Sequence, residues 1–196
     1  MKLTPGFFIS TQILLLLFTE CMLVKGAQTL RAKRLSRIQQ ISIHRKHPTN
    51  RKKVVLMCFN KNYLVVEKGR LKGTVNSSKV KEFGKFELQS FGVGIVRILN
   101  MRTRKYIAFN KEGRVYMTRG NTKDTLFHES QRNNHFVTFH SLELRSLANG
   151  VMRKWFLALK KNGKVKRPSK TFARQRSTEF LPRGWGGYKR QLMSSR

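Results

Sequence analysis

The segment YIAFNKEGRV, residues 106–115, recurs as FLALKKNGKV at residues 156–165, and a shorter version, YLVVEKGRL, occupies residues 63–71. Each copy has the pattern of an apolar strand, a polar turn with glycine near its end, and a returning strand. Glycine suits this place because turns often require a positive φ, which costs glycine little. The three glycines lie 44 and then 50 residues apart, a spacing typical of internal repeats. Three similar hairpins in one small domain predict a threefold β architecture.

Short apolar runs separated by turn residues continue from residue 54 to residue 182, without a long helical period. We expect about twelve strands in three pseudo-repeats, near residues 54–59, 62–66, 70–74, 85–90, 93–99, 105–109, 113–118, 126–130, 136–141, 154–159, 163–167 and 177–181. This all-β arrangement is a β-trefoil, whose barrel closes on itself and removes exposed sheet edges. A bulky residue follows each hairpin, and we expect Phe86, Phe127 and Phe180 to meet in the core.

Composition divides the chain into four parts. Residues 1–27 have the features of a signal peptide, because Lys2 precedes an apolar run too short to span a membrane and small residues follow it; an uncleaved anchor is the alternative. Residues 28–50 are predicted to be a flexible basic arm, in which residues 31–34 (RAKR) are either a processing site or simply part of the arm. The β-trefoil domain is predicted at residues 51–183, and residues 184–196 are predicted to be a disordered basic, glycine-rich tail.

The charge is extreme, with 42 Lys and Arg against 9 Asp and Glu and a net charge of +33. Such a surface attracts polyanions, which include nucleic acid, sulfated glycans and acidic membranes. The predicted signal peptide argues against nucleic acid and against membrane insertion, and it favours extracellular glycans.

Residues for catalysis or metal binding are not found in a recognisable arrangement. The sequence has no G-x-S-x-G motif and no phosphate loop, so we expect no enzyme and no cofactor. His44 and His47 could approach one metal ion, but solvated histidines are the expected state, and His128, His135 and His140 are scattered.

Two single residues carry modest predictions. Cys58 is the only cysteine after residue 27, and its apolar surroundings predict a core thiol, with an intermolecular disulfide as the alternative. Asn76 begins the sequon Asn76-Ser77-Ser78 and is a candidate glycosylation site in an exposed loop.

The clearest binding signal is the segment from residue 160 to residue 176, which is strongly basic and contains no acid. Its cations are Lys160, Lys161, Lys164, Lys166, Arg167, Lys170, Arg174 and Arg176. In a β-trefoil this segment is a hairpin turn followed by a loop, which would fold two basic clusters onto one face. Lys and Arg bind sulfate through charge-assisted hydrogen bonds, and the affinity should fall steeply with salt. A generically solvated basic face is the alternative.

Five segments stand in a specific order and spacing: YIAFNKEG (106–113), LFHE (126–129), NHFVTF (134–139), WFLALK (155–160) and FLP (180–182). In these segments the chain resembles the fibroblast growth factor family over residues 54–182. The resemblance implies a β-trefoil, heparan sulfate as a co-ligand, and activation of fibroblast growth factor receptor tyrosine kinases by bringing two receptors together. It therefore implies two partners, the receptor and a heparan sulfate proteoglycan.

The resemblance also implies site residues. Those for heparin are Asn60, Lys160, Lys161, Asn162, Lys166, Gln175 and Arg176, with Lys170 and Arg174 nearby. Those for the receptor are Met57, Glu129, Asn134, Phe136 and Leu181. Met57 and Phe136 stand where members often have tyrosine, Thr125 replaces a usually buried cysteine, and Val75 stands near a position where some carry arginine. Leu181 could instead be a core residue, and Asn134 could instead cap a turn.

We therefore expect a secreted extracellular growth factor that is a monomer and assembles on the glycan. The alternative is a secreted glycan-binding decoy or matrix module without receptor activation, and a nucleic-acid-binding trefoil is a third class. The changed receptor positions keep the second of these readings open.

Overall fold

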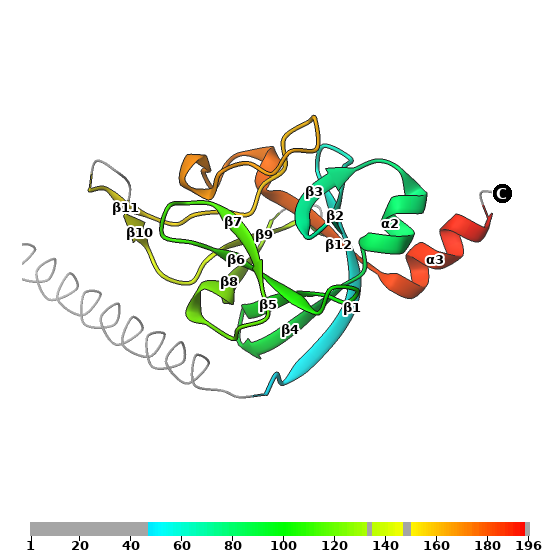
Figure 1. Cartoon of the computed structure of the whole chain (residues 1–196), viewed down its shortest axis with the longest axis horizontal. Coiled ribbons are helices and arrows are strands. Elements are labelled where there is room, and N and C mark those ends of the chain that lie inside the picture. Colours follow the sequence, from blue (N-terminus) through cyan, green and yellow to red (C-terminus); the bar gives the residue numbers. More distant parts are fainter. Residues whose placement is uncertain (1–46, 133–134, 147–149, 195–196) are drawn as a thin grey trace, which may run out of the picture. The chain divides into compact units, whose positions relative to one another are not determined.

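The computed structural model describes residues 47–132, 135–146 and 150–194 (Figure 1). The predicted signal peptide at residues 1–27 and most of the predicted arm lie outside these residues. Among the described helices, none is both long and apolar enough to cross a membrane.

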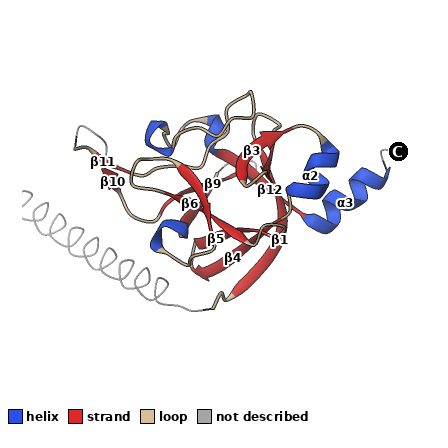
Figure 2. Ribbon diagram, in the orientation of Figure 1, coloured by secondary structure: helices blue, strands red, loops and turns tan. Residues whose placement is uncertain are grey.

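Six antiparallel strands close into a barrel. They are β1 (Asn50–Cys58), β4 (Phe86–Gly92), β5 (Ile95–Asn100), β8 (Phe127–Gln131), β9 (Val137–Ser141) and β12 (Glu179–Gly184). Strand β1 pairs with β4 and β12, β5 pairs with β4 and β8, and β9 pairs with β8 and β12, so the ring has no free edge (Figure 2). This closed barrel confirms the predicted β-trefoil.

A hairpin leaves the barrel in each repeat. The first joins β2 (Tyr63–Glu67) to β3 (Arg70–Thr74), and the second joins β6 (Lys105–Phe109) to β7 (Val115–Thr118). The third is held by the single bridges His140↔Phe156 and Leu159↔Val165. Gly69, Gly113 and Gly163 all have φ between 69° and 76°, as the repeated phrase predicts.

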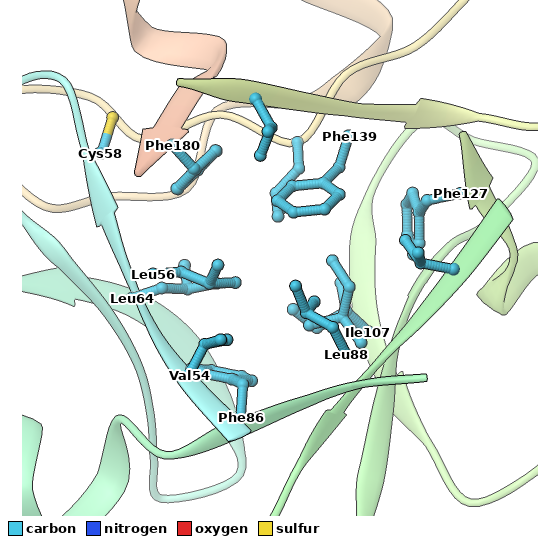
Figure 3. Close-up of a cluster of buried hydrophobic side chains, with 14 of the residues drawn as sticks. Val54, Leu56, Cys58, Leu64, Phe86, Leu88, Ile107, Phe127, Phe139 and Phe180 are labelled. Carbon is cyan, nitrogen blue, oxygen red and sulfur yellow. The ribbon is translucent and has the colours of Figure 1, made fainter. Parts of the chain in front are cut away.

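The core of the barrel is built from residues that alternate inward along the strands. On β1, Val54, Leu56 and Cys58 point into the main cluster (Figure 3). Phe86, Phe127 and Phe180 are fully buried in this same cluster, as expected. The Cys58 thiol is buried and free, and burial raises its pKa, which agrees with a core residue and not with an intermolecular disulfide.

Some predicted elements differ in the structure. The described residues contain twelve strands, but two of the predicted ones, at residues 154–159 and 163–167, are not strands in the structure. Two short strands that were not predicted are present instead, β10 (Arg145–Ser146) and β11 (Met152–Arg153). The reason is that the backbone of the third hairpin bonds partly to a loop, for example from Leu159 N to Ser177 O at 3.0 Å. The helices α2 (Ser77–Phe83), η1 (Lys123–Thr125), η3 (Pro168–Lys170) and η4 (Arg176–Thr178) were not predicted.

The predicted disordered tail is wrong for residues 185–194, which form helix α3 (Trp185–Ser194). Trp185 and Tyr188 are three residues apart and therefore share one helix face. Tyr188 is buried against Val55 and Val65 on the outer side of the barrel, and its ring lies 5.4 Å from that of Tyr63. The glycines and basic residues of this segment indicate a flexible tail, so the spacing of the two aromatic residues is not a clear helix signal.

The predicted arm also ends earlier than expected. Thr49 N donates to Ser90 O at 2.7 Å, and β1 already begins at Asn50. The exposed residues Arg51, Lys52 and Lys53 belong to the β1–β4 ladder, because their backbone pairs with Glu87, Leu88 and Gln89.

Candidate functional site

The basic surface is the set of Lys and Arg side chains between residues 160 and 176, and its first part is a rigid turn. Lys160 N donates to Lys164 O at 2.9 Å, and Gly163 N donates to Lys160 O at 3.0 Å. Gly163 has φ 76°, and a Cβ there would collide with the carbonyl oxygen of Gly73. Gly73 N in turn donates to Gly163 O at 2.7 Å. The first and third repeats therefore fix the turn that carries Lys160, Lys161 and Lys164, whose side chains are exposed.

A loop from residue 167 to residue 178 supplies the second part of the surface. The Thr171 hydroxyl donates to Pro168 O at 2.6 Å and accepts from Phe156 N at 2.8 Å, so the loop is anchored to the hairpin. Lys166 Nζ donates to Gln175 Oε1 at 2.8 Å across the two segments. The structure thus places the two basic clusters together, as the sequence predicts.

The predicted glycan residues fall into three groups. Lys160, Lys161, Asn162, Lys170, Arg174 and Arg176 are exposed. Lys166 and Gln175 are half-buried and bonded to each other. Asn60 is a brace, because its Nδ2 donates to Leu159 O at 2.9 Å and its Oδ1 accepts from Asn62 N at 3.2 Å.

Asn62 was missed by the sequence analysis. Its side chain is buried, and its Nδ2 donates to Lys161 O at 3.0 Å, which ties the turn to the loop after β1. The partner lies 99 residues away, so no local pattern marks this role.

The charges of the basic surface are unpaired. Within the described residues, the ion pairs use Glu67, Glu82, Glu87, Asp124 and Glu143, and none involves residues 160–176. Exposed cations on a fixed backbone without acid partners are suited to bind a polyanion.

Two of the predicted receptor residues are neighbours on the barrel. Met57 and Leu181 are directly paired between β1 and β12, and both are partly exposed. Leu181 lines a hollow of about 360 Å³ together with Glu129, Lys52 and His135, which we call the Glu129 hollow. Burial raises the pKa of Glu129, while the nearby Lys52 opposes this shift. Asn134 lies outside the described residues.

Phe136, another of the predicted receptor residues, does not line the Glu129 hollow. Its ring lies 5.4 Å from that of Phe59, in a second hollow of about 350 Å³. This aromatic hollow is lined by Phe59, Arg132, Phe136, Ala173, Arg174, Arg176 and Glu179. The backbone alternates at this point, so the Val137 side chain packs in the main core while Phe136 lines the aromatic hollow.

His128 and His140 are not scattered as predicted, because adjacent strands stack their rings with centroids 5.0 Å apart. Ser130 Oγ lies 3.2 Å from His128 Nδ1 and 3.3 Å from His140 Nε2. Burial lowers the pKa of His128 and brings that of His140 to about 4, so both are neutral at pH 7. The described residues contain no group of three or more potential metal ligands.

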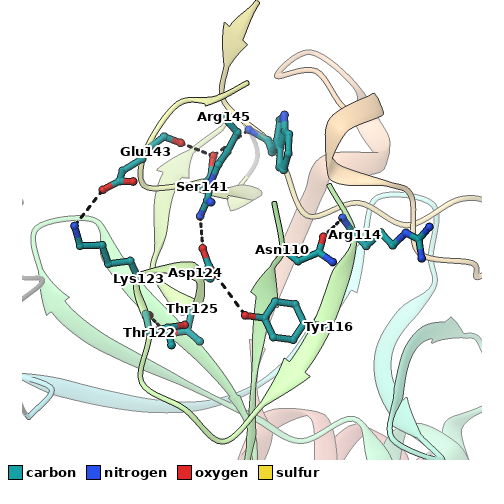
Figure 4. Close-up of polar contacts among 11 residues, drawn as sticks. Asn110, Arg114, Tyr116, Thr122, Lys123, Asp124, Thr125, Ser141, Glu143 and Arg145 are labelled. Atoms are coloured by element: carbon teal, nitrogen blue, oxygen red, sulfur yellow. Dashed lines mark hydrogen bonds and ion pairs between the residues drawn. The ribbon is translucent and has the colours of Figure 1, made fainter. Parts of the chain in front are cut away.

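A second charged region, which we call the polar corner, is formed by Tyr116, Lys123, Asp124, Glu143 and Arg145 (Figure 4). Unlike the basic surface, it contains acids that pair with its cations. Asp124 accepts from Arg145 Nη2 at 2.6 Å and from the Tyr116 hydroxyl at 3.5 Å, while Lys123 lies 3.7 Å from Glu143.

The buried Thr125, next to this corner, also has a specific partner. Its hydroxyl accepts from Arg97 Nε at 3.1 Å and donates to Thr122 O at 2.6 Å. A buried guanidinium needs an oxygen acceptor, which a cysteine thiol would supply poorly, so the departure at residue 125 has a physical reason.

Comparisons with known proteins give one consistent result. The family model described as fibroblast growth factor matches residues 52–181. The chain is 30% identical over 130 residues to fibroblast growth factor 1 of Cynops pyrrhogaster, covering 65% of this chain and 82% of that protein. It is 33% identical over 128 residues to fibroblast growth factor 7 of Homo sapiens, covering 65% and 63%, and 30% identical over 137 residues to fibroblast growth factor 3 of Gallus gallus, covering 65% and 61%. The match thus spans less than two thirds of the length of these last two relatives.

Proposed function

The chain belongs to the fibroblast growth factor family, and we propose that it is a secreted ligand that binds heparan sulfate and activates fibroblast growth factor receptors. A growth factor role and the absence of enzymatic activity follow from the family. Secretion, the glycan and receptor activation are the parts proposed for this chain.

The observation that carries the glycan part is the unpaired charge of the basic surface on a rigid support. The turn at residues 160–164 is fixed by Gly73, Asn60 and Asn62, and none of its cations has an acid partner among the described residues. A rigid array loses less conformational entropy on binding than free side chains on a mobile segment would. Each sulfate contact also releases counterions, which adds salt-dependent affinity.

The receptor part is supported by the Glu129 hollow and the Met57–Leu181 pair. These combine apolar area with one carboxyl group, which is a common composition for a protein interface. We place the receptor there and the glycan on the basic surface. Both would then bind at once, and a glycan attached near the receptor would raise the effective concentration of the ligand.

Glycosylation at Asn76 is a further part of the proposal. Asn76 is exposed and caps helix α2, with its Oδ1 accepting from Lys79 N at 3.1 Å. The bond engages the side-chain oxygen, and no hydrogen bond among the described residues uses the side-chain nitrogen, where the sugar attaches. A glycan there would therefore keep the cap in place.

The first experiment is to measure binding of residues 28–196 to a receptor ectodomain, with and without heparin, at physiological salt. Saturable binding that heparin strengthens, with receptor phosphorylation in responsive cells, is the expected result. Retention by heparin without receptor binding would instead support a decoy or matrix module. Finding the chain inside cells and absent from the culture medium would contradict secretion.

The variant Asn134→Ala tests whether receptor binding and heparin binding use different residues. We expect weaker receptor binding and unchanged heparin retention. If both properties survive, Asn134 has no part in the receptor interface.

A further inference from the structure

An exposed phenylalanine lies below one arginine of the basic surface. The Arg176 guanidinium carbon lies 4.9 Å from the centre of the Phe59 ring, and Phe59 is 41% exposed. The Phe59 ring also contacts Phe136, with the two rings tilted by 51°. Phe59 is therefore held between Phe136 and Arg176.

Two more arginines line the same aromatic hollow. Arg132 Nη2 donates to Ala173 O at 2.6 Å, which fixes the loop that carries Arg174 and Arg176. Arg132 Nε is buried without a hydrogen-bond partner in the described structure. None of the three guanidinium groups forms an ion pair with a described residue.

Stacking on a ring leaves a guanidinium able to bind an anion. The contact uses the face of the group, while its N–H donors point outward in the plane. No hydrogen bond within the described structure uses the Arg176 guanidinium, so its donors remain available. A guanidinium held in one orientation also loses less rotamer entropy when an oxyanion binds.

We propose that the aromatic hollow is a subsite for one sulfo group of a sulfated glycan, in which Phe59 is a positioning residue for Arg176. The three terminal oxygens of a sulfo group can accept from more than one guanidinium, which fits arginines that come from two segments of the chain. This inference rests on the proposed glycan binding and adds a specific subsite to it.

The chain contains a matched control. The guanidinium carbon of Arg153 lies 4.3 Å from the centre of the Phe172 ring, and Phe172 is 54% exposed. Arg153 differs from Arg176 because its Nη2 already donates to Ser169 O. Phe172 therefore supports an arginine that is engaged within the protein.

The test uses Phe59→Leu, which keeps apolar volume against Phe136 but removes the ring face. Binding of a sulfated heparin octasaccharide is measured by calorimetry at several salt concentrations, beside Phe172→Leu. We expect Phe59→Leu to weaken binding about fivefold, and Phe172→Leu to change it less than about twofold. The slope of log K against log salt should not change, since no charge is lost.

Arg176→Lys tests the orientation directly. It keeps the charge but loses the planar guanidinium with its fixed set of N–H donors. We therefore expect a loss of octasaccharide affinity similar to that of Phe59→Leu, and little further loss in the double variant. Additive losses, or a Phe59→Leu protein that binds like the wild type, would overturn the subsite while leaving glycan binding intact. A wild-type protein that does not bind the octasaccharide would overturn both proposals.

Discussion

The polar corner and the basic surface both contain Lys and Arg side chains, but these are paired with acids only in the polar corner. In the polar corner each acid lies beside a cation, so the charges neutralise one another and hold η1 near β10. In the basic surface, the cations stand on an equally fixed backbone and have no acid partner among the described residues. The comparison teaches that the positions of the few acids, more than those of the many cations, decide where positive charge stays unpaired among the described residues.

The largest effect is expected from removing the unpaired charge. Replacing Lys160, Lys161, Lys166 and Arg176 with Glu should lower heparin affinity about a thousandfold or more and abolish retention on a heparin column at physiological salt. The circular dichroism spectrum should remain that of the wild type. Unchanged retention by the folded variant would show that the glycan binds elsewhere.

The support of the basic surface can be broken without changing its charge. Gly163→Ala combines an unfavourable φ with a collision against Gly73, so we expect a loss of about 3 kcal/mol in the free energy of unfolding, measured with urea. Gly69→Ala is the matched control, since φ is 72° there but nothing lies near the added Cβ; it should cost about 1 kcal/mol. Equal losses would mean that the contact between the first and third repeats carries little stability.

The polar corner should respond in the opposite way to the basic surface. Asp124→Ala leaves the mostly buried Arg145 guanidinium without its carboxylate, so unfolding should become easier by about 2 kcal/mol, with heparin retention unchanged. Glu143→Ala, whose partner Lys123 is largely exposed, should cost less than about 0.5 kcal/mol. A drop in heparin retention for Asp124→Ala would contradict the separation of the two regions.

The smallest effect is expected from removing an acid that lies close to the cations of the aromatic hollow. Glu179 is the one acid that lines it. Glu179→Gln should raise octasaccharide affinity about twofold, because it removes a repulsive charge near Arg176. Calorimetry of the two proteins at low salt checks this, and weaker binding by the variant would mean that Glu179 orients the arginines.

The sequence predicts the architecture well where residue types repeat. Gly69, Gly113 and Gly163 mark the three hairpins, and Phe86, Phe127 and Phe180 mark the shared core, because turn conformation and burial both constrain the residue locally. Helix α2 was missed because Val80 is its only buried residue, which leaves no hydrophobic period to detect.

The site was predictable only in part for a related reason. Charge identifies the cations of residues 160–176, but it does not show which are braced. The contacts of Asn62 with Lys161 and of Phe59 with Arg176 join residues about a hundred positions apart, and nothing in the local sequence indicates them. Phe59 would otherwise be taken for a core residue at the end of a strand.

The pairing of β1 with β12 also sets an order of events during synthesis. Val54 pairs with Gly184, and Cys58 pairs with Phe180, so the barrel cannot close until residue 184 has left the ribosome. Contacts so distant in sequence make folding slow, since a long loop must close before they form. Until then the Cys58 thiol is exposed to oxidants, and closure of the last strand removes that hazard.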